Sequence, residues 1–227
     1  MNLEGIQAIT FDAAGTLIEP YPSVGEVYAE ELAKLGYPLS ADLLNDRFRT
    51  SFKAQKSSKP EVVLDRDSWR AIVAGTLAGL TPTDTFDAQF DALWNAFAQP
   101  ERWRLLPGVE STLAQLHAHG QRLFVLSNND SRLRGIIDGL GIGQYFEAIF
   151  ISAELGAEKP SPRIFELVRE AIGVDASELL HVGDSPVEDI QGALDAGWWA
   201  ALVGPKAGLP HSVDSASATT IADLFAT

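Results

Sequence analysis

Short apolar runs that stop at polar residues recur along the chain, at residues 6–11, 122–126, 148–151 and 179–182, with a weaker one at 199–203. Amphipathic segments with helical spacing lie between them, at residues 108–119, 131–140, 161–172 and 187–196. Buried strands that alternate with helices predict an α/β fold, a parallel sheet with helices on both faces. We therefore expect a three-layer Rossmann-like core.

A long stretch from residue 20 to residue 104 breaks this alternation. It contains no convincing buried strand, but apolar side chains recur at helical spacing at residues 24–35, 43–52, 69–80 and 86–97. We expect a polar loop at residues 53–60. The pattern predicts an α-helical cap over residues 20–104, inserted into a core made of residues 1–19 and 105–227. Residues 215–227 are expected to form a linker and a short final helix.

Acidic residues follow the first and the fourth apolar runs. Asp12 comes directly after the first, and Asp184 and Asp189 follow the fourth. Because ligands of an open parallel sheet bind beyond the carboxyl ends of its strands, we expect these carboxylates to converge. Neighbouring carboxylates repel one another unless a cation neutralises them, and oxygen ligands suit Mg²⁺. A single aspartate after a strand is often only a helix cap or turn residue, so the ordered series carries the prediction.

The chain as a whole is strongly acidic. It has 17 Lys and Arg against 31 Asp and Glu, a formal net charge of −14. Such a surface repels phosphate backbones and anionic lipid, so we expect no nucleic-acid partner and no membrane partner. The same field repels a small phosphorylated substrate, so an anion site in this protein needs a local cation.

The residue types narrow the chemistry further. The chain has no cysteine and four histidines, which excludes disulfides, thiolate nucleophiles and cysteine metal sites and disfavours a histidine metal cage. No apolar run has membrane length, and the first residues lack the features of a signal peptide. We therefore expect a cytoplasmic location, while the oligomeric state stays open.

Four short motifs occur in order at the strand ends. They are Asp12-x-x-Gly15-Thr16, Ser127-Asn128, Lys159-Pro160 and Gly183-Asp184-x-x-x-x-Asp189. Their order and context resemble the four motifs of the haloacid dehalogenase superfamily. The resemblance covers almost the whole chain, including a helical cap between the first two motifs. It implies a hydrolase that acts on small phosphorylated metabolites.

The resemblance also implies how these residues bind and transfer a phosphoryl group. Asp12 would be the nucleophile that attacks phosphorus and forms an aspartyl-phosphate. Ser127 and the backbone of Asn128 would hold the phosphoryl oxygens, and Lys159 would neutralise both the nucleophile and the phosphate. Gly15 would let the backbone turn close to the phosphate.

The cofactor implied by the resemblance is magnesium. Mg²⁺ would be held by Asp12, the backbone carbonyl of Ala14 and Asp184. Asp189 would complete the site by orienting a water on the metal or Lys159. We therefore expect a Mg²⁺-dependent hydrolase.

One position departs from the family pattern. Phosphatases of the superfamily usually carry a second aspartate two residues after the nucleophile, where this chain has Ala14. That aspartate protonates the leaving group and then activates the water that attacks the aspartyl-phosphate. Losing such a general acid/base typically lowers the rate about 10²–10⁴-fold. Glu19 and residues of the cap are candidates for a substitute acid.

Because Ala14 replaces this aspartate, the sequence is also consistent with activities other than that of a phosphatase. Phosphonoacetaldehyde hydrolases also have alanine there and use a cap lysine as a Schiff base, and Lys53, Lys56 and Lys59 lie in the predicted cap. The 2-haloacid dehalogenases carry an aromatic residue there and dispense with Mg²⁺, which Ala14 and the intact run at residues 183–189 argue against. A third alternative is a weakly active descendant that binds a phospho-ligand or a protein partner.

Two further sets of residues are predicted to be structural. His181 lies inside an apolar strand and is expected to be a buried histidine with its hydrogen bonds satisfied. The five tryptophans lie within or beside helical segments and are expected to pack rather than to form a stacking platform.

Overall fold

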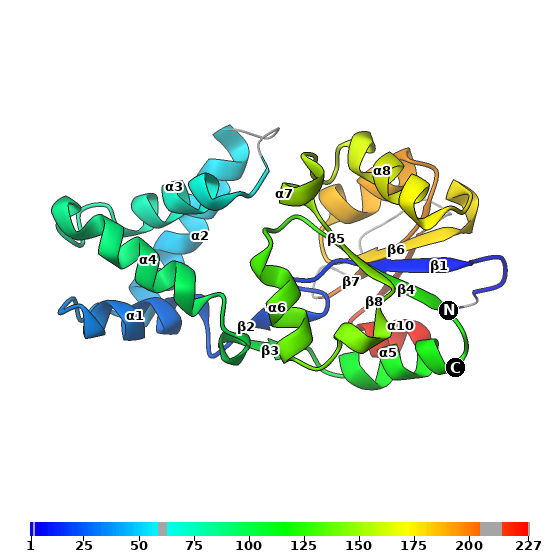
Figure 1. Cartoon of the computed structure of the whole chain (residues 1–227), viewed down its shortest axis with the longest axis horizontal. Helices are drawn as coiled ribbons and strands as arrows, with labels where there is room; N and C mark the ends of the chain where they lie inside the picture. Colours follow the sequence, from blue (N-terminus) through cyan, green and yellow to red (C-terminus); the bar gives the residue numbers. More distant parts are fainter. Residues whose placement is uncertain (2, 59–62, 205–214, 227) are drawn as a thin grey trace.

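The computed structural model describes residues 1, 3–58, 63–204 and 215–226 (Figure 1). Six parallel strands form one sheet in the order β5-β4-β1-β6-β7-β8. Their bounds are β1 (Ala8–Phe11), β4 (Arg122–Ser127), β5 (Ala148–Ile151), β6 (Leu179–Gly183), β7 (Trp199–Val203) and β8 (Ser215–Ala218). The predicted parallel α/β core is confirmed.

Helices cover both faces of this sheet. Alternate strand residues point to opposite faces, so Ile9 and Phe11 of β1 join one apolar cluster while Ala8 joins the other. The first cluster includes α5 (Val109–Ala118), α6 (Arg132–Gly139) and α10 (Ile221–Phe225). The second includes α8 (Pro162–Ile172), α9 (Gly192–Asp195) and the π-helical turn Pro186–Gln191 before α9.

The strand register brings the polar strand ends together. Phe11, the last residue of β1, pairs with Val125 of β4 on one side and with Val182 of β6 on the other. The backbone N–H of Asp12 continues this ladder by donating to the carbonyl of Val182 at 2.8 Å. Residues that follow β1, β4 and β6 therefore meet at one edge of the sheet.

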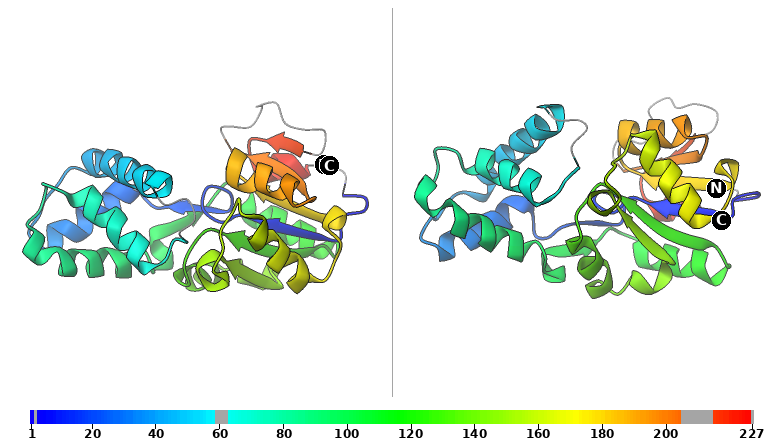
Figure 2. Two further views of the ribbon diagram at one scale, coloured as in Figure 1. Left: turned by 90° about the horizontal axis from the view of Figure 1, so that it is seen from above. Right: turned by 45° about the horizontal axis from the view of Figure 1, so that its top comes forward.

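A separate helical unit stands at one end of the molecule, away from both chain termini (Figures 1 and 2). Its helices are α1 (Val24–Lys34), α2 (Ala41–Ser58), α3 (Arg66–Leu77) and α4 (Phe86–Ala96). They share an apolar cluster of their own, which includes Tyr28, Leu44 and Phe90. This unit, which we call the cap, is inserted between two short antiparallel strands, β2 (Ile18–Pro20) and β3 (Trp103–Leu105).

The remaining elements are short. They are α7 (Ser152–Leu155) and four 3₁₀ turns, Thr83–Thr85, Pro100–Arg102, Gly143–Tyr145 and Ala176–Glu178. None of the helices in the described parts of the chain has the length and apolarity that a membrane-spanning helix needs. We propose that the core comprises residues 1–19 and 105–227 and the cap residues 20–104. The separate apolar clusters support this division.

The structure corrects three local predictions. Residues 53–58 are not a loop, because α2 continues through them to Ser58; residues 59 and 60 lie outside the described residues. Residues 215–218 are not a linker but the edge strand β8, which pairs with β7. The sequence does not indicate this strand, because serine and alanine are not the residues that mark a strand in a sequence. The expected helix at residues 187–196 begins as a π-helical turn at Pro186.

Candidate active site

Asp12 lies at the carboxyl end of the central strand β1 and starts a tight loop. The carbonyl of Ala13 accepts hydrogen bonds from the backbone N–H groups of Leu17 at 2.8 Å and Ile18 at 3.0 Å. Gly15, inside this loop, has a φ of +93°, a conformation that costs other residues strain. The loop thus turns sharply directly after the Asp12 carboxylate, which is largely buried.

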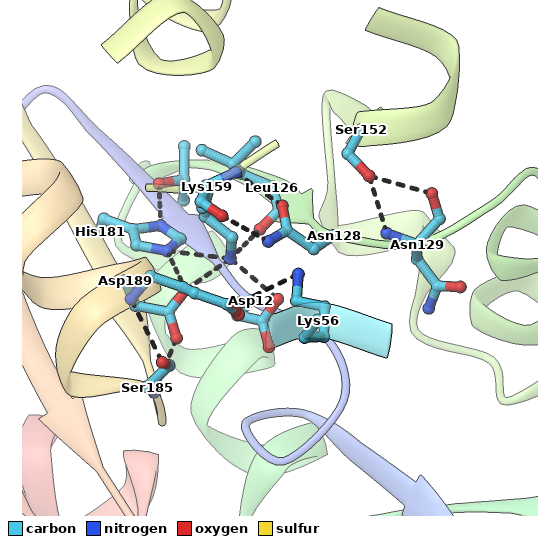
Figure 3. Close-up of polar contacts among 12 residues, drawn as sticks. Asp12, Lys56, Leu126, Asn128, Asn129, Ser152, Lys159, His181, Ser185 and Asp189 are labelled. Atoms are coloured by element: carbon cyan, nitrogen blue, oxygen red, sulfur yellow. Dashed lines mark hydrogen bonds and ion pairs between the residues drawn. The ribbon is translucent and has the colours of Figure 1, made fainter. Parts of the chain in front are cut away.

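Lys159 contacts Asp12 from the loop between α7 and α8. Its Nζ donates to Asp12 Oδ1 at 2.9 Å, to Asp189 Oδ1 at 2.5 Å and to the backbone carbonyl of Leu126 at 2.8 Å (Figure 3). An ammonium has three N–H donors, and these three oxygens occupy all of them. Lys159 is 1% exposed, so a buried cation is fixed between two carboxylates.

His181 holds Asp189 from the other side. Its Nε2 lies 3.0 Å from Asp189 Oδ1, and its Nδ1 lies 2.7 Å from the hydroxyl of Thr10 on β1. Because an ionised carboxylate only accepts hydrogen bonds, we assign the ring proton to Nε2, and the Thr10 hydroxyl then donates to Nδ1. His181 is fully buried and its hydrogen bonds are satisfied, as expected, but its contact with Asp189 was not predicted.

The charges of this group are unbalanced. Asp12, Asp184 and Asp189 each offer a carboxylate oxygen within 4.8 Å of the others, whereas Lys159 is the cation that contacts Asp12 and Asp189. Burial raises the pKa of Asp12 to about 7, and the charges of Asp189 and Asp184 act in the same direction against Lys159. The cluster therefore carries more negative charge than Lys159 offsets.

The groups around Asp12 also have shifted pKa values, and the shifts differ in direction. Burial opposes the charge of Asp189, but the Lys159 ammonium and the hydrogen bond from His181 hold the pKa of Asp189 well below its usual range. Burial also opposes the charge of Lys159, but Asp12 and Asp189 keep its pKa above the usual value. Burial and the Lys159 charge lower the pKa of His181, so its imidazole is neutral.

The donor set fits a hard divalent cation. All three clustered side chains offer oxygen, the ligand type that Mg²⁺ prefers. Burial is the main cause of the raised pKa of Asp12, and the nearby charges of Asp189 and Asp184 add to it. Both oxygens of Asp189 already accept hydrogen bonds, Oδ1 from Lys159 and His181 and Oδ2 from the backbone N–H of Ser185 at 2.8 Å. Both carboxylate oxygens of Asp189 are thus already engaged by groups of the protein itself.

The two polar residues predicted after β4 are also at this edge. Ser127 ends the strand and is 2% exposed. The Asn128 side chain accepts from the backbone N–H of Lys159 and donates to its carbonyl, both at 2.8 Å. Asn128 thus fixes the backbone of Lys159, a contact that the sequence did not reveal.

A largely apolar cavity of about 240 Å³ lies between the cap and this edge of the sheet. Ala14 and Asn128 line it from the core, and Trp69, Trp94 and Trp103 line it with other aromatic residues. Glu19, expected as a substitute acid, is not among its lining residues and instead pairs with Arg104 through β2 and β3. The cavity therefore adjoins the Asp12 loop through a methyl group, not a carboxyl group.

Of the three cap lysines considered, Lys56 reaches the core. Its Nζ lies 2.5 Å from Glu158 Oε1 and 3.1 Å from Glu188 Oε1, the neighbours in sequence of Lys159 and Asp189. Lys53 is exposed on the same helix, and Lys59 lies outside the described residues. Burial opposes the charge on Lys56, but Glu158 and Glu188 hold its pKa above the usual value.

The fold and this site define a parallel α/β protein with a helical cap and a cluster of carboxylates around a lysine at the carboxyl ends of its strands. A family model for haloacid dehalogenase-like hydrolases matches residues 6–197. Human haloacid dehalogenase-like hydrolase domain-containing protein 3 is 34% identical over 218 residues, which cover 92% of this chain and 87% of that protein. The chain therefore belongs to the haloacid dehalogenase-like hydrolases, as its motifs indicated.

Two further similarities bear on the activity and the fold. A phosphoserine phosphatase of Thermus thermophilus is 37% identical over 108 residues, 47% of this chain and 43% of that protein. The crystal structure of the putative HAD-hydrolase YfnB of Bacillus subtilis, bound to magnesium, superposes with a TM-score of 0.81 at 18% identity and covers 97% of both chains. The protein is thus a hydrolase with phosphatase relatives.

Proposed function

We propose that this protein is a Mg²⁺-dependent phosphatase of small phosphorylated metabolites that works through an aspartyl-phosphate on Asp12. The observation that carries the proposal is the buried contact of 2.9 Å between Asp12 and Lys159, whose ammonium also contacts Asp189. A carboxylate that attacks a phosphate dianion needs a cation at this place to offset the repulsion between like charges.

In the proposed first step, a carboxylate oxygen of Asp12 bonds to phosphorus while the bond from phosphorus to the ester oxygen breaks. The leaving oxygen takes the electron pair of that bond. In the second step a water oxygen bonds to phosphorus while the bond from phosphorus to the Asp12 oxygen breaks. Asp12 keeps the electron pair as a carboxylate, and the protons of the water leave with inorganic phosphate. Lys159 stabilises the developing charge in both steps, and Ser127, Asn128 and the Gly15 turn bind the phosphoryl oxygens.

Asp12, Asp184 and the backbone carbonyl of Ala14 would hold Mg²⁺, while Asp189 orients Lys159. When bound, the ion supplies positive charge that offsets the repulsion between the phosphate and the carboxylates. The closely spaced carboxylate oxygens of Asp12, Asp184 and Asp189 support this assignment. A cytoplasmic location remains part of the proposal.

The charge of Lys56 favours a phosphatase over a phosphonoacetaldehyde hydrolase. A Schiff base forms from a neutral amine, whereas Glu158 and Glu188 keep the pKa of Lys56 above its usual value. A dehalogenase and a weakly active phospho-ligand-binding protein are kept as alternative outcomes of the test.

The test is turnover of a panel of phosphate esters, phosphonoacetaldehyde and a 2-haloacid, with Mg²⁺ and with a chelator. We expect phosphate release from esters, dependent on Mg²⁺, and loss of it in Asp12→Asn. The matched control is Asp42→Asn, at an exposed position on α2, which retains wild-type turnover. Acid-quenched protein should carry radiolabelled phosphate that hydroxylamine removes, as expected of an acyl phosphate.

Three results would contradict the proposal. Ester turnover that survives Asp12→Asn would exclude Asp12 as the nucleophile. Turnover of the haloacid or of phosphonoacetaldehyde alone, the latter with borohydride trapping of Lys56, would assign a different reaction. Binding of phosphate without any turnover would indicate the weakly active descendant.

A further inference from the structure

The cavity between cap and core is built mainly from aromatic side chains. Phe48 and Phe52 of α2, Trp69 of α3, and Phe90 and Trp94 of α4 all contribute to its wall. Its volume is about 240 Å³. Since a cavity of about 150 Å³ accommodates benzene, this one has room for one aromatic ring with substituents. Aromatic walls favour such a ring through edge-to-face and offset stacking.

The one charged side chain in the described lining is already neutralised. Arg132 donates from Nε to Asp130 Oδ1 at 2.8 Å and from Nη2 to Asp130 Oδ2 at 2.7 Å, and Asp130 is buried. Its Nη1 donates to the backbone carbonyl of Trp94 at 3.1 Å, and the guanidinium lies 3.5 Å from the centre of the Trp94 ring. The described lining therefore has no unpaired charge for a charged substituent, and the cavity suits an uncharged, apolar group.

The same cavity meets the Asp12 loop at Ala14, where no side chain can donate a proton. An ester oxygen that leaves without a proton leaves more readily when its conjugate acid is stronger. A phenolic hydroxyl has a pKa of about 10, as in tyrosine, whereas water, which resembles an aliphatic alcohol, has one of about 15.7. The absence of a general acid at position 14 and the aromatic wall of the cavity therefore both favour a phenol as the leaving group.

We propose that the substrate is an aryl phosphate, a phosphate monoester of an uncharged phenol whose ring occupies this cavity. This inference rests on the proposed phosphatase function. The bond from phosphorus to the aryl oxygen breaks as Asp12 bonds to phosphorus. The phenolate leaves with the electron pair and takes its proton from water after release, so no acid at position 14 is needed.

The test compares substrates of equal size that differ in the acidity of the leaving group. Phenyl phosphate and cyclohexyl phosphate are assayed with the whole protein and Mg²⁺, and acetyl phosphate serves as a probe that reacts at Asp12 without filling the cavity. We expect kcat/KM for phenyl phosphate to exceed that for cyclohexyl phosphate about 100-fold or more. Ala14→Asp should narrow this ratio by raising cyclohexyl phosphate turnover more than phenyl phosphate turnover.

Two cavity variants test where the ring binds. Val73→Phe reduces the cavity and Phe52→Ala enlarges it, so the inference does not depend on the folding of one of them. Each should raise KM for phenyl phosphate at least tenfold while changing KM for acetyl phosphate far less. The matched control is Leu43→Phe, at an exposed position on α2, which should behave as the wild type.

Two outcomes overturn the inference and leave the proposed function standing. One is an equal kcat/KM for phenyl and cyclohexyl phosphate, or a ratio that Ala14→Asp does not change. The other is an equal rise in KM for phenyl and acetyl phosphate in the cavity variants. If neither acetyl phosphate nor any ester is hydrolysed through Asp12, the proposed function itself fails and the inference fails with it.

Discussion

Gly15 lies so close to Asp184 that a Cβ atom on Gly15 would sit 2.8 Å from the carboxyl carbon of Asp184. The loop after β1 therefore packs its backbone directly against a carboxylate that follows β6. This close approach explains the glycine in the first motif independently of any phosphate, because a side chain there would displace a member of the acidic cluster.

Gly15→Ala should therefore harm the protein more than backbone strain alone would. Gly15 has a φ of +93° and Gly36 a φ of +89°, but a Cβ on Gly36 meets no atom within 4 Å. Gly36→Ala is thus the matched control, with a strain cost of about 1–3 kcal/mol in the free energy of unfolding. We expect Gly15→Ala to exceed that cost and to abolish measurable turnover, whereas Gly36→Ala stays active. Urea unfolding measures the stability of the two variants and a turnover assay measures their activity. Equal stability and equal turnover of Gly15→Ala and Gly36→Ala would contradict this prediction.

His181 should act as a positioning residue for Asp189. His181→Phe removes the donor to Asp189 and the acceptor of the Thr10 hydroxyl. Asp189 Oδ1 then keeps Lys159 as its donor, and the Thr10 hydroxyl keeps the carbonyl of Leu180 at 3.4 Å as its acceptor. A hydrogen bond to a charged group is worth about 1.5–3 kcal/mol, so we expect a loss of up to that size in urea unfolding and a lower kcat with little change in KM. His181→Gln, whose amide can still donate to Asp189, should recover part of kcat. The prediction fails if the Phe and Gln variants have the same kcat.

The sequence carries enough information for the central sheet and for the order of the strand-end residues. Asp12, Lys159 and Asp189 could be grouped because each follows an apolar run or lies in a recognisable motif. The contacts of these residues with His181 and Asn128 could not be predicted, because such contacts depend on which strands are neighbours in the sheet. His181 meets Thr10 only because β6 pairs with β1 in that register.

Other features leave no local pattern at all. The bridge from Lys56 to Glu158 joins residues 102 positions apart, in the cap and in the core. The end of α2 is polar because residues such as Lys53 are exposed, and this same polarity suggested a loop. Such features follow from tertiary packing, which overrides the local composition of a segment.

Lys56 should stabilise the contact between cap and core by neutralising Glu158. The Glu158 side chain is 5% exposed, and its Oε2 is buried with no hydrogen-bond partner in the described structure. Lys56→Met leaves this carboxylate without its cation, and we expect a loss of about 1–3 kcal/mol in the free energy of unfolding. Lys53→Met, on the exposed side of the same helix, is the matched control and should cost little.

The pH dependence and a second substitution check the cause of that loss. Burial raises the pKa of Glu158, and removing Lys56 raises it further. Because a raised pKa favours the folded state when the group is protonated, the defect of Lys56→Met should shrink as the pH falls towards 5. Lys56→Met/Glu158→Gln should recover at least half of the lost stability. If the double variant is no more stable than the single one, the ion pair is not the cause.

Mg²⁺ binding should be linked to ionisation of Asp12. Because burial raises the pKa of Asp12 to about 7, above its unfolded value, the metal-free protein should lose stability as the pH rises through that value. Mg²⁺ must displace the same proton, so its apparent affinity should rise about tenfold per pH unit below pH 7 and level off above it. Calorimetric titration with Mg²⁺ between about pH 5.5 and 8.5 measures this slope. Asp12→Asn should bind Mg²⁺ weakly and without the slope, whereas equal affinity at both ends of the range in the wild type would exclude Asp12 as a ligand.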